Sequence, residues 1–332
     1  MQELFIQSLK NKTNNTNSFV NEIAEILDIG YDAAYRRINL KTSLTLDESV
    51  KLAKHFNISL NKLFEIGNKN SIVTELSPPI NDVKGLEHWI RESTKHVITV
   101  KKIKNAQFIY SSKDIPIFHT LTDSLLTRYK MYVWLKDLNV EMAKSKISFD
   151  DWVQTIPKSL LTSAFDLGEI YKHTNIIELW SDNTVNGSIQ QVLYYFEAGL
   201  VSKEYALQIC DDIRDVINHV EDKTINQSIG VQNSSNSFML YKCDLQTLSN
   251  TIMVITPYGK IFFSPFTVLS YFKVEHKETC EMMYEFLQKL MSNSKLLTTT
   301  GERDRTIFFK KVHQKISIAK ERINMGDKMT YI

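Results

Sequence analysis

The sequence lacks a long hydrophobic run, a secretory signal pattern and a cysteine framework. A membrane-spanning helix needs about 18 or more consecutive apolar residues, and no stretch of the 332 residues approaches this. The start, Met1-Gln2-Glu3-Leu4, is not the basic and apolar pattern of a signal sequence. We therefore expect a cytoplasmic protein with no membrane partner. The three cysteines, Cys210, Cys243 and Cys280, are odd in number and widely spaced, which fits a reducing compartment and core positions.

The common catalytic and metal-binding signatures are also missing. The sequence contains no phosphate loop, no GxGxxG fingerprint, no HExxH motif and no CxxC pair. His276 and Cys280 lie four residues apart on a predicted helix beside Glu275, but two or three ligands without a second cluster rarely form a zinc site. We therefore expect a protein that is not an enzyme and has no cofactor or metal.

The N-terminal part of the sequence predicts two helices separated by a glycine turn. Apolar residues recur at three- and four-residue spacing from 19 to 27, which indicates a buried helix. Gly30 can turn the chain and is an acceptable N-cap for a second helix that begins near Tyr31. On that helix Ala34 and Ile38 share one side, while polar side chains occupy the opposite side and its flank. Such an outer face suits contact with base edges or phosphates.

The next segment predicts two more helices with their caps. Thr45 followed three residues later by Glu48 is a capping box. Ser59 is placed to cap a short closing helix. The buried stripes of these helices are Leu46, Val50, Ala53 and Phe56, then Leu60, Leu63 and Phe64. Five short helices therefore fit within the first seventy-five residues.

This helix, glycine turn and helix, continued by SLTLDESVKLAKHFNISLNKLF, resembles the lambda-repressor-like (Cro/XRE-type) helix-turn-helix regulators over residues 3–66. The resemblance implies a recognition helix that begins near Tyr31, with Tyr31, Asp32 and Arg36 at the base-reading positions. The sequence departs from the family pattern where Gly30 replaces the usual Ser or Thr cap and Arg37 replaces an apolar residue. We expect DNA contacts from Tyr31, Asp32, Tyr35, Arg36, Arg37, Asn39 and Lys41.

The charge balance of residues 1–75 bears on how such a domain binds. The segment carries nine Lys and Arg residues against nine Asp and Glu residues, so it is neutral. Neutralisation of phosphates supplies most sequence-independent affinity for DNA, and a neutral single copy would bind poorly. We therefore expect a homodimer on double-stranded DNA, because paired domains add affinity and site length.

The domain boundaries follow from composition. Residues 67–82 are polar and contain Ser77-Pro78-Pro79, which is typical of an extended linker. We predict a DNA-binding domain over residues 1–70, a linker over 71–82 and a C-terminal domain over 83–332. Gly199 and Ser202 are expected to end one C-terminal helix and to cap the next.

The C-terminal domain is predicted to be helical over 83–232 and α+β over 233–332, with the change of character at 232–236. Within the helical part, residues 107–111 are expected to form a short strand, and residues 176–180 either a strand or a short buried turn. Four segments after this point are rich in β-branched and aromatic residues: 238–245, 251–256, 260–264 and 268–274. Pro257-Tyr258-Gly259 is a tight-turn signal between two of them, so we expect a small antiparallel sheet followed by two helices. The fold class is therefore mainly α: a five-helix lambda-repressor-like domain plus a larger α+β domain with helices and a small antiparallel sheet.

Aromatic side chains cluster in the predicted strands. They either line a ligand pocket or fill a core: Tyr258, Phe262, Phe263, Phe266, Tyr271 and Phe272. The C-terminal domain is larger than dimerisation requires. We therefore expect it to respond to an effector, either a small molecule or a peptide.

These patterns favour a sequence-specific transcriptional regulator with a C-terminal domain that dimerises and senses a ligand. Two alternatives remain, because a fold does not fix a function. The helix-turn-helix is then a protein-interaction module that never contacts DNA, or a targeting module on an unidentified enzyme or scaffold.

Overall fold

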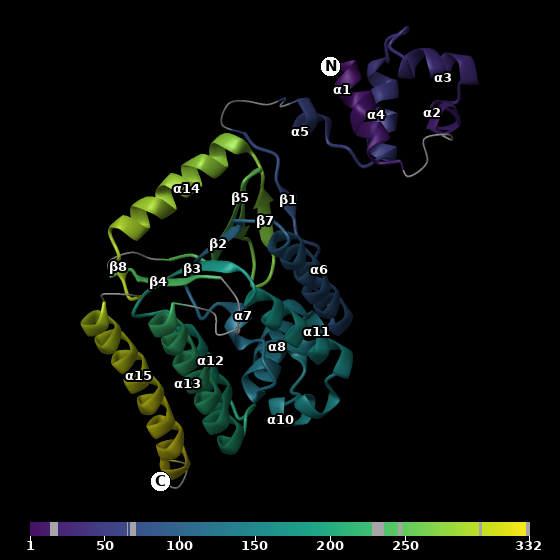
Figure 1. Ribbon diagram of the computed structural model, residues 1–332. Coiled ribbons are helices and arrows are strands. Elements are labelled where there is room, and N and C mark those ends of the chain that lie inside the picture. The colour runs from purple at the N-terminus through teal and green to yellow at the C-terminus, as the bar shows by residue number, and fades with distance from the viewer. Residues whose placement is uncertain are drawn as a thin grey trace. The chain divides into compact units, whose positions relative to one another are not determined.

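The computed structural model describes residues 1–13, 19–64, 66, 71–227, 236–244, 248–298 and 301–329 (Figure 1). Its described part is mainly helical with one mixed sheet, and the chain forms two compact units, Met1–Val73 and Thr74–Ile332. None of the described helices is both long and apolar enough to cross a membrane. Most of the predicted break at 232–236 lies outside the described residues.

The first unit contains five helices among its described residues: α1 (Gln2–Lys10), α2 (Phe19–Leu27), α3 (Tyr31–Ile38), α4 (Leu46–His55) and α5 (Leu60–Phe64). One apolar core joins them, and it includes Ala34 and Ile38 of α3. The predicted capping box is confirmed: Thr45 Oγ1 accepts from Glu48 N at 3.1 Å, and a Glu48 carboxylate oxygen accepts from Thr45 N at 2.9 Å. Helix starts in this unit are therefore fixed by residues close in sequence.

The turn between α2 and α3 differs in one detail from the prediction. Gly30 is the N-cap of α3, as expected, but its φ of −66° is open to any residue. Asp28 turns the chain instead, in the left-handed region at φ 55°. The short polar side chain of aspartate tolerates this conformation better than most.

The described residues of the second unit form an eight-stranded sheet in the order β1-β7-β6-β5-β2-β3-β4-β8. β2, β3 and β4 are parallel neighbours, and every other pair is antiparallel. The strands are β1 (Glu75–Leu76), β2 (Gln107–Ser111), β3 (Asn175–Trp180), β4 (Phe238–Lys242), β5 (Thr251–Thr256), β6 (Gly259–Pro265), β7 (Tyr271–Val274) and β8 (Lys295–Leu296).

This sheet corrects two sequence predictions and confirms part of a third. The expected small antiparallel sheet is part of a larger mixed one, in which β4 pairs with β3 and β8 rather than with β5. Within the part predicted to be helical, β2 confirms the short strand expected at 107–111, and residues 176–180 form a strand rather than a buried turn. The predicted linker 71–82 is partly structured, since β1 pairs with β7 and Ile80 is buried.

Helices cover both faces of the sheet (Figure 1). α14 (Lys277–Ser292) packs on one face, where Ile109 of β2 contributes to the core. Phe108 and Tyr110 of the same strand belong to the core on the other face. The remaining helices are α6 (Val83–Lys101), α7 (Ile117–Thr120), α8 (Leu125–Leu138), α9 (Val140–Lys144), α10 (Phe149–Trp152), the 3-10 helix η1 (Val153–Thr155), α11 (Lys158–Tyr171), α12 (Asn186–Glu197), α13 (Lys203–Asn226) and α15 (Glu302–Met329).

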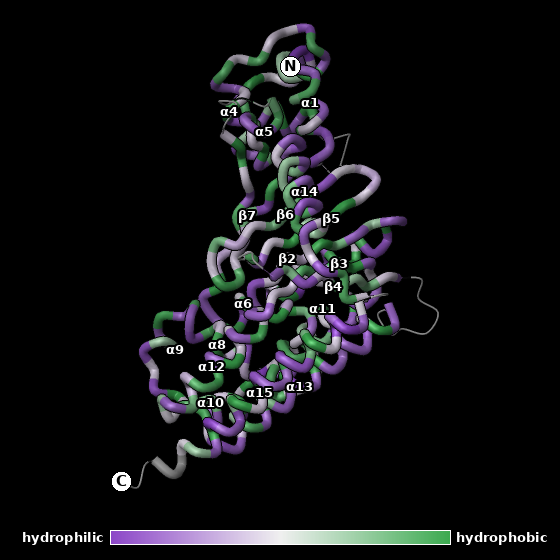
Figure 2. Tube along the Cα trace, turned by 90° about the vertical axis from the view of Figure 1, so that its left-hand side faces the viewer, coloured by the Kyte–Doolittle hydropathy of each residue, from purple (hydrophilic) through white to green (hydrophobic). Residues whose placement is uncertain are grey.

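Several local predictions in the second unit are confirmed. Gly199 follows the C-cap of α12 with φ 67°, and Ser202 caps α13 by accepting from Tyr205 N at 3.3 Å. All three cysteines are buried. Hydrophobic and hydrophilic positions alternate along α13 and α15, as expected for helices with one buried face (Figure 2).

Candidate functional site

The first candidate surface is the outer face of α3. Ala34 and Ile38 are buried, whereas Tyr31 and Tyr35 are 54% and 45% exposed. The two tyrosine rings stack with their centroids 6.4 Å apart. The other predicted contact residues with exposed side chains are Asp32, Arg36, Asn39 and Lys41. Two aromatic rings and a guanidinium on one short helix can stack on, or hydrogen-bond to, a nucleic acid.

Arg37 differs from the other predicted DNA contacts. Its Nε lies 3.0 Å from both carboxylate oxygens of Glu48, and a terminal nitrogen lies 2.7 Å from one of them. The other terminal nitrogen donates to Ala33 O at 3.2 Å. This hydrogen bonding holds the pKa of the Glu48 carboxyl below its usual value and raises that of Arg37. Arg37 therefore fastens α3 to α4, which argues against its expected role in contacting DNA.

The loop after α3 is held by Gln2 of α1. Its Nε2 donates to Arg37 O and Thr42 O, each at 3.0 Å, and its Oε1 accepts from Leu44 N at 3.2 Å. The Asn39 amide nitrogen donates to Tyr35 O at 2.9 Å, within its own helix. Tertiary hydrogen bonds thus fix the backbone of the loop that carries Lys41.

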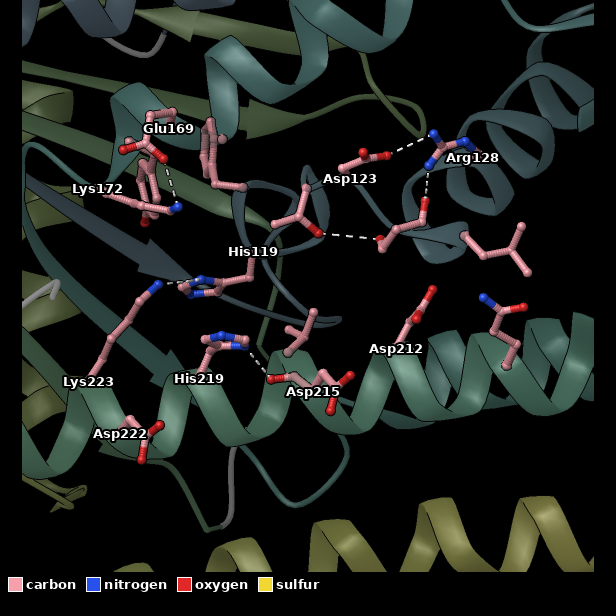
Figure 3. Close-up of a pocket in the computed structure, with 18 of the residues that line it drawn as sticks. His119, Asp123, Arg128, Glu169, Lys172, Asp212, Asp215, His219, Asp222 and Lys223 are labelled. Carbon is pink, nitrogen blue, oxygen red and sulfur yellow. Dashed lines mark hydrogen bonds and ion pairs between the residues drawn. The ribbon is translucent and has the colours of Figure 1, made fainter. Parts of the chain in front are cut away.

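The second candidate site is a cavity of about 950 Å³ in the second unit (Figure 3). Its lining comes from α7, the start of α8, the end of α11 and one face of α13. The aromatic cluster of the strands lies in a different region. Phe262 is buried in a core and Phe263 packs against one, whereas Tyr258 and Phe266 are 88% and 56% exposed. Neither of them lines the cavity. A cavity of this volume falls in the range of small-molecule sites.

Beneath the cavity floor lies Glu178 of β3, which is fully buried. Side chains alternate along a strand, so Glu178 faces the helical side together with Ile176 and Trp180. Tyr171 Oη donates to Oε1 at 3.1 Å and Trp180 Nε1 donates to Oε2 at 2.9 Å. His119 Nε2 lies 2.8 and 3.0 Å from the two oxygens. A buried carboxylate needs such partners, because burying an unpaired charge is costly.

These contacts assign the protons of His119. A carboxylate only accepts, so Nε2 carries a proton and donates to Glu178. Nδ1 is then the acceptor in the neutral ring, and Lys223 Nζ lies 3.5 Å from it. Burial lowers the pKa of His119 and also that of Lys223. Three residues from three elements thus form a chain of hydrogen bonds that runs from the cavity into the core.

Close packing of α7 against α11 brings His119 to Glu178. A Cβ at Gly168 of α11 would collide with the carbonyl oxygen of Leu121, which follows α7. Only glycine allows this approach. Phe118 of α7 then stacks on Tyr171 with ring centroids 4.1 Å apart. These contacts hold His119 and Tyr171 in place beside the buried Glu178 carboxylate.

The charges around the cavity are unevenly compensated. Arg128 pairs with Asp123 at 2.8 Å, and Lys172 pairs with Glu169 at 2.7 Å. Three lining carboxylates on α13 have no cationic partner among the described residues: Asp212, Asp215 and Asp222. The cavity therefore carries an excess of negative charge.

The pair His276 and Cys280 has a structural explanation. His276 Nδ1 accepts from Thr279 N at the start of α14, and Cys280 is buried against Val274 O. Among the described residues, no three His, Cys, Asp or Glu side chains are placed to hold a metal ion.

The Glu178 network was not predicted from the sequence. Its signal is a single carboxylate in the apolar strand Ile176-Ile177-Glu178-Leu179-Trp180, where a charged residue must have partners. Comparison of the chain with protein-family models, curated proteins and solved structures gives no match. The functional argument therefore depends on the geometry of these residues.

Proposed function

We propose that the protein is a sequence-specific DNA-binding transcriptional regulator of the lambda-repressor-like type, with α3 as its recognition helix. The proposal depends on one observation: some side chains of α3 anchor the helix to the rest of the unit, and the others are exposed. Ala34 and Ile38 attach the helix to the core and Arg37 ties it to α4, which leaves Tyr31, Asp32, Tyr35 and Arg36 exposed. A recognition helix needs this combination of rigid support and free polar side chains.

The proposal includes a homodimer on double-stranded DNA. The first seventy-five residues are neutral, so one copy gains little from phosphate attraction. Two copies related by a two-fold axis would read half-sites about 34 Å apart. The second unit supplies the surface for pairing and the cavity for an effector.

The test is selection from a random double-stranded DNA pool with the full chain. We expect an enriched site with two half-sites about one DNA turn apart. Arg36→Ala should weaken binding to that site by about 1–3 kcal/mol without loss of stability, if Arg36 makes a bidentate base contact. Lys51→Ala, which removes the same charge from an exposed position on α4, is the matched control and should have a smaller effect.

The Arg37→Ala variant distinguishes a residue that stabilises α3 from a residue that contacts DNA. This variant should destabilise the first unit, because Glu48 loses its guanidinium partner. Selection that enriches no sequence, or unchanged affinity in a folded Arg36→Ala variant, would contradict the assignment. The alternative, a protein-interaction or targeting module on an enzyme or scaffold, would then be favoured by the buried Glu178, His119 and Lys223 chain.

A further inference from the structure

The chain of Lys223, His119 and Glu178 has the arrangement of an activated nucleophile. A nucleophile lies beside a base, and a third group orients the base. Lys223 Nζ lies 3.5 Å from His119 Nδ1, and His119 Nε2 lies 2.8 Å from Glu178. Such contacts are often long before a ligand binds. Nothing in the proposed DNA-binding function uses these groups.

We propose that Lys223 forms a Schiff base with a neutral aldehyde or ketone bound in the cavity, and that His119 takes the proton from its ammonium group. Lys223 lies on α13 and lines the cavity together with His119. Among the described residues, no carboxylate lies within ion-pair distance of Lys223, so none holds the ammonium directly. Burial lowers the pKa of Lys223 and outweighs the opposing charge of the Glu178 carboxylate, which favours the free amine.

The reaction balances without an oxidant or reductant. His119 Nδ1 accepts a proton from Lys223, and the resulting imidazolium is stabilised by the Glu178 carboxylate. The amine then attacks the carbonyl carbon: a C–N bond forms, and the electrons of the C=O double bond move to oxygen. The imidazolium returns its proton to that oxygen, and His119 then takes one proton from the positively charged nitrogen, which gives a neutral carbinolamine. His119 returns this proton to the hydroxyl group, the nitrogen lone pair expels it as water, and a protonated imine remains.

Glu178 is held for this role by two further donors. Tyr171 Oη and Trp180 Nε1 occupy one carboxylate oxygen each, so the group cannot rotate away from His119. His119 thereby keeps Nδ1 directed toward Lys223. We regard Glu178, Tyr171 and Trp180 as positioning residues, because they act through His119.

The charge and shape of the cavity define the ligand class. Among the described residues no cation pairs with Asp212, Asp215 or Asp222, and their negative charge disfavours keto acids and other anionic carbonyl compounds. Phe118 and Val216 add apolar surface to the lining. A neutral carbonyl compound with an apolar body therefore fits better than a small anionic one.

Reductive trapping tests the proposal on the full chain. The protein is treated with benzaldehyde and sodium cyanoborohydride, and mass spectrometry of the digest measures benzylation of each lysine. Lys172 is the internal control, because it lines the same cavity and pairs with Glu169. We expect Lys223 to be modified several-fold faster than Lys172. Equal or slower modification of Lys223 in the wild-type protein overturns the proposal and needs no variant.

Two variants assign the roles. Lys223→Arg keeps a cation at the position and should abolish only the adduct at residue 223. His119→Gln should slow adduct formation at Lys223 by about 100-fold or more, as loss of a general base does, and leave the Lys172 rate unchanged. If His119→Gln is folded and traps benzaldehyde at the wild-type rate, the role of His119 is wrong.

The ligand class has its own test. Glyoxylate, which carries a carboxylate, should modify Lys223 more slowly than benzaldehyde under the same conditions. A faster reaction with glyoxylate would overturn the preference for neutral compounds. All of these readouts are independent of DNA, so their failure leaves the DNA-binding proposal intact, and the reverse also holds.

Discussion

Each unit contains one glutamate whose carboxylate accepts several hydrogen bonds, and the two carboxylates differ in their exposure and in their partners. Glu48 of the first unit lies near the surface, with 16% of its side chain exposed, and binds Arg37 and the backbone of Thr45. Glu178 of the second unit has no exposed surface and binds three side chains. The first carboxylate joins two helices, whereas the second orients an imidazole.

The two carboxylates differ in the charge of their direct partners. Arg37 and Glu48 neutralise each other, so the ion pair leaves the exposed face of α3 to other residues. Among the described residues, Glu178 has no cation in direct contact, and the Lys223 amine lies one imidazole away from it. The Arg37–Glu48 pair thus links two helices near the surface, while the buried contacts of Glu178 lead through His119 to Lys223 in the cavity lining.

Loss of the buried carboxylate should have the largest effect. Glu178→Ala leaves three buried donors without their acceptor and should destabilise the second unit by about 3–5 kcal/mol. Glu48→Ala is the matched variant in the first unit and should cost about 1–2 kcal/mol, through loss of the cap and of the Arg37 ion pair near the surface. Urea unfolding followed by tryptophan fluorescence reports on the second unit, because all four tryptophans lie there: Trp89, Trp134, Trp152 and Trp180. Urea unfolding followed by circular dichroism measures the first unit. Equal costs for the two variants would remove the contrast.

The acid sensitivity of the first unit should be the next largest effect. The pKa of Glu48 is held low in the folded state by the hydrogen bond from Arg37, so its contribution to stability is present above the ordinary glutamate value of about 4.3. That contribution is lost as the pH falls through the lower, folded-state value. Circular dichroism will show this as a loss of helix that tryptophan fluorescence does not detect.

Glu48→Gln is the control for the acid effect. Glutamine keeps a side-chain acceptor for the capping box but does not titrate. The variant should unfold more easily near neutral pH and lose the acid-dependent step. An unchanged step in this variant would assign the acid sensitivity to another group.

The smallest effect is expected at the N-cap of α3. Gly30 has φ −66°, and a Cβ there meets nothing within 4 Å. Gly30→Ser should stabilise the first unit by a few tenths of a kcal/mol, because serine supplies the missing side-chain acceptor. Gly30→Ala adds a Cβ without an acceptor and should be destabilising. Thermal unfolding by circular dichroism compares the two variants, and the same sign for both would reject the capping explanation.

The sequence revealed features that depend on near neighbours. The capping box of Thr45 and Glu48, the caps at Gly199 and Ser202 and the start of α3 after Gly30 are confirmed, because each involves residues a few positions apart. The periodicity also gave a mainly helical chain with a sheet in its larger part. DNA contact by α3 stays a prediction, and Arg37 is better explained by its bond to Glu48.

The sequence did not reveal features that depend on distant pairs. Gln107 of β2 pairs with Asn175 of β3, and no pattern of neighbouring residues in the sequence predicts that these two strands pair. The chain of hydrogen bonds joins His119 to Glu178 and Lys223 across 59 and 104 positions. Burial of a glutamate in an apolar strand was the one visible signal of this site. The sequence left open whether the clustered aromatics fill a core or line a pocket, because their exposure depends on which face of the sheet is covered; Phe262 is buried and Tyr258 is exposed.

The close approach at Gly168 constrains which substitutions the fold can accept over evolutionary time. Any side chain there would separate α7 from α11 and move His119 away from its carboxylate. Gly168, Tyr171, Glu178 and Trp180 lie within thirteen consecutive residues, so they form a short fingerprint that can be sought in diverged sequences. We expect a homologue that keeps this fingerprint, with a histidine and a lysine at the other two positions, to share the cavity chemistry proposed for this chain, whatever the sequence of its α3.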